Sequence, residues 1–178
     1  MNEDDQVRRG DEEPDAPQAA SSPRKGVPAR RQGRIIAMQA LFEIDAVAQG
    51  ANASIAALAA EYGVADPAVR FATALVAGTL ARQPEIDALI ATFAPQFPLD
   101  QLAAVDRAVL RVAVYELRYG AKAPPKAVVN EAIEIAKEYG GDASGRFVNG
   151  VLGRVLTLPP PPPSDEAKKE VRDEDMLT

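Results

Sequence analysis

The chain has 178 residues, of which 26 are acidic and 20 are basic, and it contains neither histidine nor cysteine. Without these two residue types a chain lacks the commonest general base, the thiolate nucleophile, the disulfide bond and the commonest metal ligands. No group of aspartate and glutamate residues has the spacing of a hard-metal loop. The composition therefore argues against enzymatic chemistry, a bound metal and any other cofactor.

The sequence carries no signal for export or for membrane insertion. The first 29 residues have no apolar run flanked by positive charge, so they do not resemble a signal peptide. No segment approaches the roughly 18 uninterrupted apolar residues of a membrane span. We therefore expect a cytoplasmic protein that has no contact with a membrane.

The net charge of −6 is distributed unevenly along the chain. Residues 1–15 carry a net charge of −5, whereas residues 16–34 carry a net charge of +5 and no acidic residue. A polyanion that approaches the second segment would meet concentrated positive charge, although the whole chain is acidic. We expect the acidic segment to compete with such a polyanion, because the two segments are tethered to each other.

Both ends of the chain differ in composition from its centre. Residues 1–29 combine prolines, small residues and charges, and we expect them to form a disordered, acidic and proline-rich arm. Residues 159–178 begin with a polyproline run and continue as a charged tail. The remaining span, 30–158, is long enough to build a hydrophobic core of its own.

Helix-opening and helix-ending signals divide this span into about seven helices and no strand. Most expected starts carry a serine, an aspartate or a proline, residues that satisfy or dispense with free N–H groups of the first turn. Gly63 and Gly140 are expected to end the second and sixth helices, and Pro95 and Pro98 to break the fourth. The expected starts, in chain order, are Arg30, Ser54, Asp66, Pro84, Asp100, Pro125 and Ser144.

Apolar residues recur at helical spacing within these segments. Alanine is abundant and aromatic residues make up only 5% of the chain, so small side chains allow helices to cross closely. The sequence alone therefore predicts an all-α helical bundle. In the first helix, for example, the apolar face consists of Ala37, Ala40, Leu41, Ile44 and Val47.

Three blocks of the sequence resemble the NusB family of bacterial antitermination factors. The most specific block contains 129–137 and 147–152, and the other two are 106–117 and 30–42. They stand in the order of the family, and the first and last of them lie near the two ends of the span 30–158. The segment between Ala46 and Gln101 matches the family only in its helical pattern. The resemblance implies two small helical bundles packed together, with the basic first helix beside the C-terminal helices.

Arg30, Arg31 and Arg34 form the basic cluster of the first helix. Cations at a helix start are disfavoured by the helix dipole, whereas a phosphate bound there would receive both the guanidinium groups and free N–H groups. By itself the cluster fits either a solvated helix start or a phosphate-binding site. The resemblance favours RNA binding.

The predicted seventh helix begins with an unusual mixture of residues. An exposed aromatic ring can stack an unpaired base and the polar groups can bind it, although Phe147 by itself also fits a core position. The resemblance implies that this region binds RNA, but Ala143 stands where relatives often carry an acid. The candidate RNA-binding residues here are Ser144, Arg146, Phe147 and Asn149.

Asp106 and Glu116 fit either an exposed solvated face or a surface for a protein partner. In the family, a surface around residues corresponding to 100–117 binds the small-subunit ribosomal protein also called NusE. That partner is basic, so the sign of these two charges is suitable. Asn130 and Glu131 have no accompanying nucleophile, and we do not expect catalysis there.

The resemblance implies a non-enzymatic RNA-binding factor. It would bind boxA-type single-stranded RNA of ribosomal RNA operons together with NusE and act on transcribing RNA polymerase. One alternative is a helical interaction module that forms a homodimer. The other is a stand-alone domain for ribosomal RNA, related to the NusB-like domain of ribosomal RNA methyltransferases.

Overall fold

The computed structural model describes residues 26–47, 50–120 and 123–159. Almost all of the expected acidic arm and nearly the whole expected tail lie outside these residues. The described residues contain no strand, which confirms the all-α prediction. They form seven α-helices and one 3-10 helix, namely α1 (Ala29–Val47), α2 (Ala51–Tyr62), α3 (Asp66–Ala81), α4 (Gln83–Phe93), η1 (Leu99–Gln101), α5 (Ala104–Arg118), α6 (Pro125–Tyr139) and α7 (Ser144–Val155).

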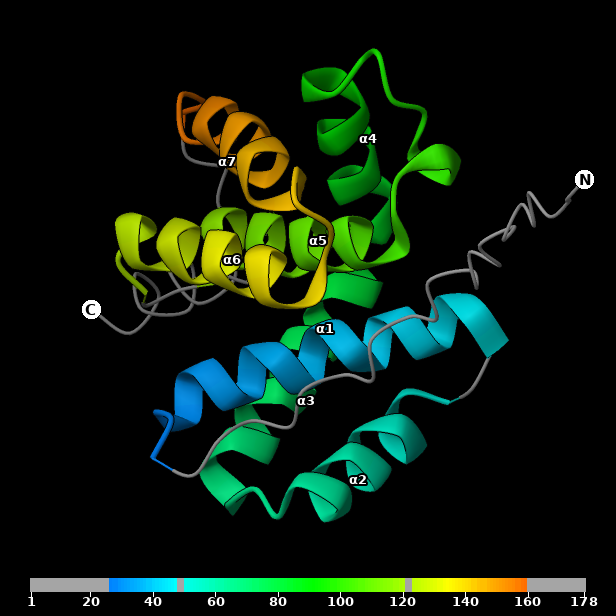
Figure 1. Cartoon of the computed structure of the whole chain (residues 1–178), viewed down its shortest axis with the longest axis vertical. Helices are drawn as coiled ribbons and strands as arrows, with labels where there is room; N and C mark the ends of the chain where they lie inside the picture. The colour runs from blue at the N-terminus through cyan, green and yellow to red at the C-terminus, as the bar shows by residue number, and fades with distance from the viewer. Residues whose placement is uncertain (1–25, 48–49, 121–122, 160–178) are drawn as a thin grey trace, which may run out of the picture.

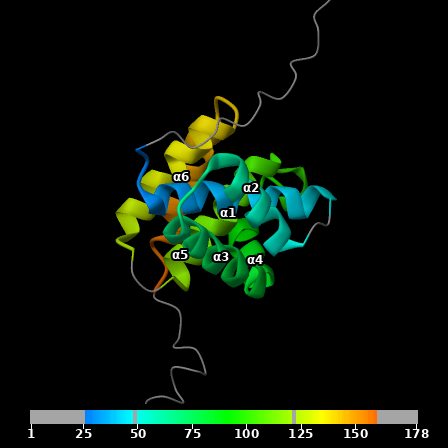
Figure 2. The same cartoon turned by 90° about the horizontal axis from the view of Figure 1, so that it is seen from below.

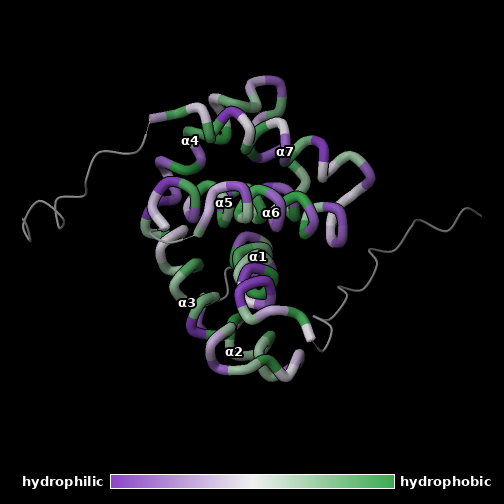
Figure 3. The backbone as a smooth tube through the Cα atoms, turned by 90° about the vertical axis from the view of Figure 1, so that its left-hand side faces the viewer, coloured by the Kyte–Doolittle hydropathy of each residue, from purple (hydrophilic) through white to green (hydrophobic). Residues whose placement is uncertain are grey.

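The helices form two packed groups, α1–α3 and α4–α7 (Figure 1). Seen from the side, α2 lies at one end, α1 lies next to α5 and α6, and α4 and α7 lie at the opposite end (Figure 3). The view from below also places α1 beside α6 (Figure 2). The expected position of the first helix beside the C-terminal helices is therefore confirmed.

Helix α1 is the central helix of the fold. Every residue from 33 to 41 is buried, because α2 and α3 cover one side of α1 and α5 covers another. A helix enclosed in this way buries side chains all around its axis, including polar ones. One continuous core joins the two groups of helices through residues such as Ile35, Ile36, Leu110, Val128 and Leu152.

Small residues bring α1 close to α3. A Cβ atom added at Gly33 would lie 2.8 Å from the Phe71 ring and 2.9 Å from the Ala68 carbonyl oxygen. Ala68 and Ala72 are fully buried at the same crossing. The close crossing expected from the alanine-rich composition is present here.

Two predicted helix starts are wrong. Helix α2 begins at Ala51, and Ser54 is fully buried inside it instead of capping it. Asp100 lies in η1, and α5 begins only at Ala104 because the backbone at Leu102 is extended, with ψ of 143°. Gly63 ends α2 as expected, with the left-handed φ of 60° that glycine adopts readily.

Among the described helices, none is long and apolar enough to cross a membrane.

Candidate nucleic-acid interface

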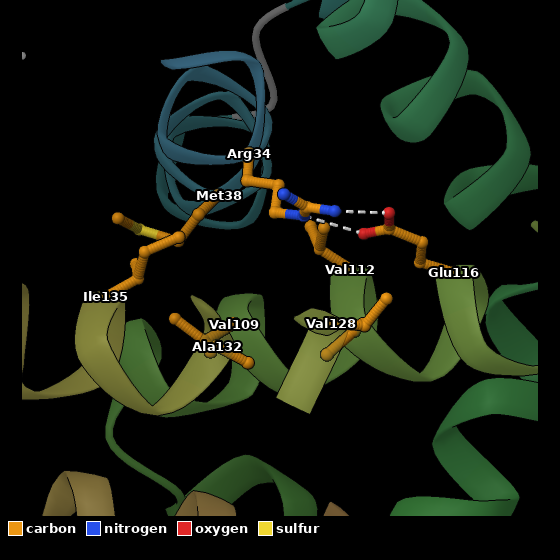
Figure 4. A pocket seen from close by; sticks show the side chains of 9 residues that line it. Arg34, Met38, Val109, Val112, Glu116, Val128, Ala132 and Ile135 are labelled. Carbon is orange, nitrogen blue, oxygen red and sulfur yellow. Dashed lines mark hydrogen bonds and ion pairs between the residues drawn. The ribbon is translucent and has the colours of Figure 1, made fainter. Parts of the chain in front are cut away.

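Arg34 is buried and paired with Glu116 on α5 (Figure 4). Its Nε donates to Glu116 Oε2 at 2.9 Å and its Nη2 donates to Oε1 at 2.6 Å. The two residues are only 7% and 4% exposed, respectively. The expectation that both lie on the surface, Arg34 for RNA and Glu116 for a protein partner, is wrong because α1 is enclosed between other helices.

The small cavity beside this ion pair is not a ligand site. It lies between α1, α5 and α6 and has a volume of about 10 Å³. Such a volume is at the limit for a single water molecule. Its lining is apolar apart from the ion pair, with Met38, Val112, Val128 and Ile135 among the side chains that surround it (Figure 4).

Arg31 is half-buried and held by two carboxylates of α6. Its Nη1 donates to Glu131 at 3.0 Å and its Nη2 donates to Glu138 at 3.0 Å. Desolvation lowers the pKa of Arg31, but the two carboxylates outweigh that effect and the pKa lies above its ordinary value. The positive charge of Arg31 is therefore largely compensated inside the protein.

Arg30 is the exposed arginine at the start of α1. Its guanidinium lies 5.1 Å from the centroid of the Phe71 ring, a cation–π distance. It forms no salt bridge with another described residue. Arg30 and Arg31 line a groove of about 340 Å³ between the start of α1 and the start of α6. Pro124 and Ala127 line the same groove.

Ser144 and Asp106 bind each other instead of facing a ligand. The Ser144 hydroxyl donates to the Asp106 carboxyl group and accepts the Gly141 N–H at 3.0 Å. Burial raises the pKa of Asp106 above its ordinary value, although the hydrogen bond from Ser144 acts in the opposite direction. Asp106 is only 7% exposed, so the expectation that it lies on the surface is wrong: the start of α7 covers the start of α5.

The other residues predicted on α7 reach the surface. Arg146 and Asn149 are exposed, and Phe147 is half-buried. The Phe147 ring contacts the Phe97 ring edge to face, with the centroids 5.4 Å apart and the planes at 74°. Phe147 thus packs on the core and also borders a surface cleft, which combines the two alternatives of the sequence analysis.

The cleft beside Phe147 was not predicted. It has a volume of about 340 Å³ and lies between α7 and the segment that joins α4 to η1. Phe97, in that segment, is 51% exposed. The sequence signal for it is an aromatic residue between Pro95 and Pro98, but the two prolines by themselves predict only a break between helices.

The candidates that reach the surface, whether exposed or half-buried, form two groups at the starts of α1 and α7. Arg30 and Arg31 form the first group, and Arg146, Phe147 and Asn149 form the second. Helix α6 connects them, since Arg31 binds its carboxylates and α7 follows its C-terminus. The protein is therefore a helical binding protein. Its surface combines cations with aromatic rings, a combination also found in proteins that bind single-stranded nucleic acid.

The chain belongs to the NusB family, whose family model matches residues 31–157. The transcription antitermination protein NusB of Herpetosiphon aurantiacus is 44% identical over 133 residues, which cover 73% of this chain and 91% of the relative. The protein of that name from Chloroflexus aggregans is 42% identical over 130 residues, which cover 72% of this chain and 87% of the relative.

Solved structures of the family have the same fold. T. maritima NusB aligns with a TM-score of 0.69 and 33% identity, and the alignment covers 80% of this chain and 98% of that one. A chain from the crystal structure of antitermination factors NusB and NusE in complex with dsRNA aligns with a TM-score of 0.66 and 26% identity, covering 71% and 95%. The resemblance found in the sequence is confirmed.

Proposed function

We propose that this chain is a transcription antitermination factor that binds boxA-type single-stranded RNA of ribosomal RNA operons together with NusE. The resulting complex acts on transcribing RNA polymerase by assembly, without catalysis. The similarity to transcription antitermination proteins, and to a chain solved in a complex of NusB and NusE with dsRNA, supports this proposal. The observation that carries it in this chain is the group at the start of α7, where the exposed Arg146 and Asn149 lie beside the half-buried Phe147 ring.

In this proposal the two groups at the starts of α1 and α7 have different tasks. Arg30 binds phosphate, since its charge has no carboxylate partner among the described residues. Arg146 and Asn149 offer hydrogen bonds to the RNA, and the half-buried Phe147 ring contacts a base. Arg34 and Ser144 support the site from inside the protein through Glu116 and Asp106.

The NusE surface remains proposed for the region 100–117. Asp45 and Asp87, which lie beside α5, are already held by Arg111 at 2.6 and 2.7 Å. Asp100 is exposed and forms no ion pair with another described residue, so its carboxylate is available to a basic partner. Asp106 and Glu116 contribute there only from the interior.

An electrophoretic mobility-shift experiment tests the proposal. BoxA-type RNA is titrated with the full chain, with and without NusE, and a scrambled RNA serves as the control. We expect a specific shift that NusE strengthens and that the double change Arg146→Ala and Asn149→Ala weakens. Equal binding of the two RNAs would contradict the proposal.

The reverse titration, in which boxA-type RNA is added to the chain at two fixed protein concentrations, tests the homodimer alternative. A dimer formed through the RNA-binding surface would mask Arg31 and Phe147. The apparent RNA affinity would then fall as the protein concentration rises, because dimerisation competes with RNA. An affinity that is independent of protein concentration supports direct RNA binding.

A further inference from the structure

We propose that the cleft between α7 and the segment joining α4 to η1 holds one unpaired RNA base, stacked on the ring of Phe97. This inference rests on the proposed RNA-binding function and extends it to a residue of the α4–η1 segment. The cleft lies at the end of the molecule where α4 and α7 are side by side (Figure 1, Figure 3). Its volume of about 340 Å³ falls in the lower part of the range of roughly 300 to 1,000 Å³ for small-ligand sites.

A short rigid turn presents the Phe97 ring. The Phe97 N–H donates to the Ala94 carbonyl at 2.9 Å, which closes a turn with Pro95 at its second position. Proline fixes its own φ there, and Pro98 restricts the backbone of Phe97 on the other side. Ala94 is only 5% exposed and anchors the turn in the core. A ring held in this way loses little conformational entropy when a base stacks on it.

The contact with Phe147 leaves the Phe97 ring open to solvent. The two planes are at 74°, so a base that stacks on one ring meets the other ring edge-on. Phe97 remains 51% exposed and is one of three large apolar side chains of the described residues with such exposure. Every base has a flat aromatic surface, so this geometry accepts any of the four bases when it is unpaired.

The charges around the cleft select a polyanion. Arg146 and Arg154 line it, and none of the described carboxylates does. Arg154 Nη1 donates to the Phe93 carbonyl at 3.3 Å, which holds its guanidinium across the cleft. Two cations beside an exposed ring match the phosphates on either side of a stacked base. The side-chain amide of Gln96, also in the lining, can bind a base edge.

Fluorescence anisotropy with labelled boxA-type RNA and the full chain tests the inference. We expect Phe97→Ala and Phe97→Leu each to weaken RNA binding roughly 5- to 150-fold, because both remove the stacking surface. Phe42→Ala is the matched control, since Phe42 is 40% exposed on α1 outside the cleft and should keep the wild-type affinity. Circular dichroism should show an unchanged helical content in all three variants.

RNAs with a single abasic position provide the second measurement. An RNA with one abasic position should bind the wild-type chain more weakly than the complete RNA does. Phe97→Ala should bind the two RNAs almost equally, because the stacking between the base and the ring is already absent from this variant. NusE affinity, measured by calorimetry without RNA, should be the same for wild type and Phe97→Ala.

Four outcomes overturn the inference in distinguishable ways. If the wild-type chain fails to bind RNA, the proposed function fails with it. If the wild type binds and Phe97→Ala binds equally well, only the inference fails. Wild-type affinity in Phe97→Leu would mean that Phe97 only packs on Phe147. Unchanged RNA affinity with weakened NusE binding in Phe97→Ala would assign the cleft to the protein partner.

Discussion

Arg34 on α1 and Glu116 on α5 form a buried ion pair that joins the two groups of helices, with two nitrogen–oxygen distances of 2.9 and 2.6 Å. The Arg34 guanidinium also lies 5.6 Å from the centroid of the Phe71 ring on α3. One arginine therefore links three helices. A buried pair of this kind fixes the relative position of the helices even where its net contribution to stability is small, because either charge alone would be unpaired.

We predict that removing one member of this pair strongly destabilises the protein. Arg34→Ala or Glu116→Ala leaves a buried charge without its partner, and the free energy of unfolding should fall by about 3 to 5 kcal/mol. Urea unfolding followed by circular dichroism measures the change. The double variant Arg34→Met with Glu116→Leu should be more stable than either single variant, since no charge remains. Single variants within about 1 kcal/mol of wild type would contradict the prediction.

The sequence predicted the local features of the fold well because their signals are local. Pro125 opens α6 and Gly140 follows its last residue, as expected. The wrong prediction of where α5 begins has a local cause as well. Asp100 resembles a capping residue, but the chain first forms a 3-10 turn and then an extended step at Leu102.

The sequence could not reveal which charged residues are buried. Arg30, Arg31 and Arg34 look equivalent in the sequence, yet Arg34 meets a partner 82 residues away and Arg31 meets partners 100 and 107 residues away. Such pairs depend on which helices cover α1, and no local pattern encodes that. The same reason applies to Asp106 and Ser144: the sequence predicts a protein partner for Asp106 and RNA for Ser144, whereas the two side chains bind each other.

We predict that Asp106 makes stability depend on pH in a defined direction. Its pKa is raised in the folded protein by burial, so the folded state holds the proton more tightly than the unfolded state does. Its contribution to stability is therefore complete below the ordinary value of 3.8 and is lost as the pH rises through the raised pKa.

Asp106→Asn tests this direction, because asparagine keeps an acceptor for Ser144 and does not titrate. The free energy of unfolding of wild type minus that of Asp106→Asn should fall as the pH increases from the ordinary value of 3.8 through the raised pKa of Asp106. Urea unfolding at a series of pH values measures the difference. A difference that stays constant, or that rises with pH, would show that the carboxyl group is not disfavoured in its charged form.

We predict that Arg30 contributes one phosphate contact to RNA binding. Arg30→Ala should weaken binding and reduce the slope of log affinity against log salt by about 0.7 for single-stranded RNA. Arg82→Ala is the matched control, because its guanidinium also lies over an aromatic ring, 5.2 Å from the centroid of Tyr119. Titrations at several salt concentrations measure both slopes. An unchanged slope in Arg30→Ala, or an equal change in Arg82→Ala, would rule out a specific phosphate contact at Arg30.

The last prediction separates packing from base contact at Phe147, which is half-buried against Phe97. Phe147→Ala should reduce RNA affinity by about 1 to 3 kcal/mol. It should also reduce the free energy of unfolding by less than the about 3 to 5 kcal/mol expected for a fully buried phenylalanine. Phe147→Leu keeps most of the apolar contact and removes the aromatic ring, so it should recover the stability and not the RNA affinity. Thermal unfolding and RNA anisotropy on the same samples measure the two effects. If Phe147→Leu restores RNA affinity together with stability, Phe147 acts through packing alone, and Arg146 and Asn149 carry the RNA contacts of α7.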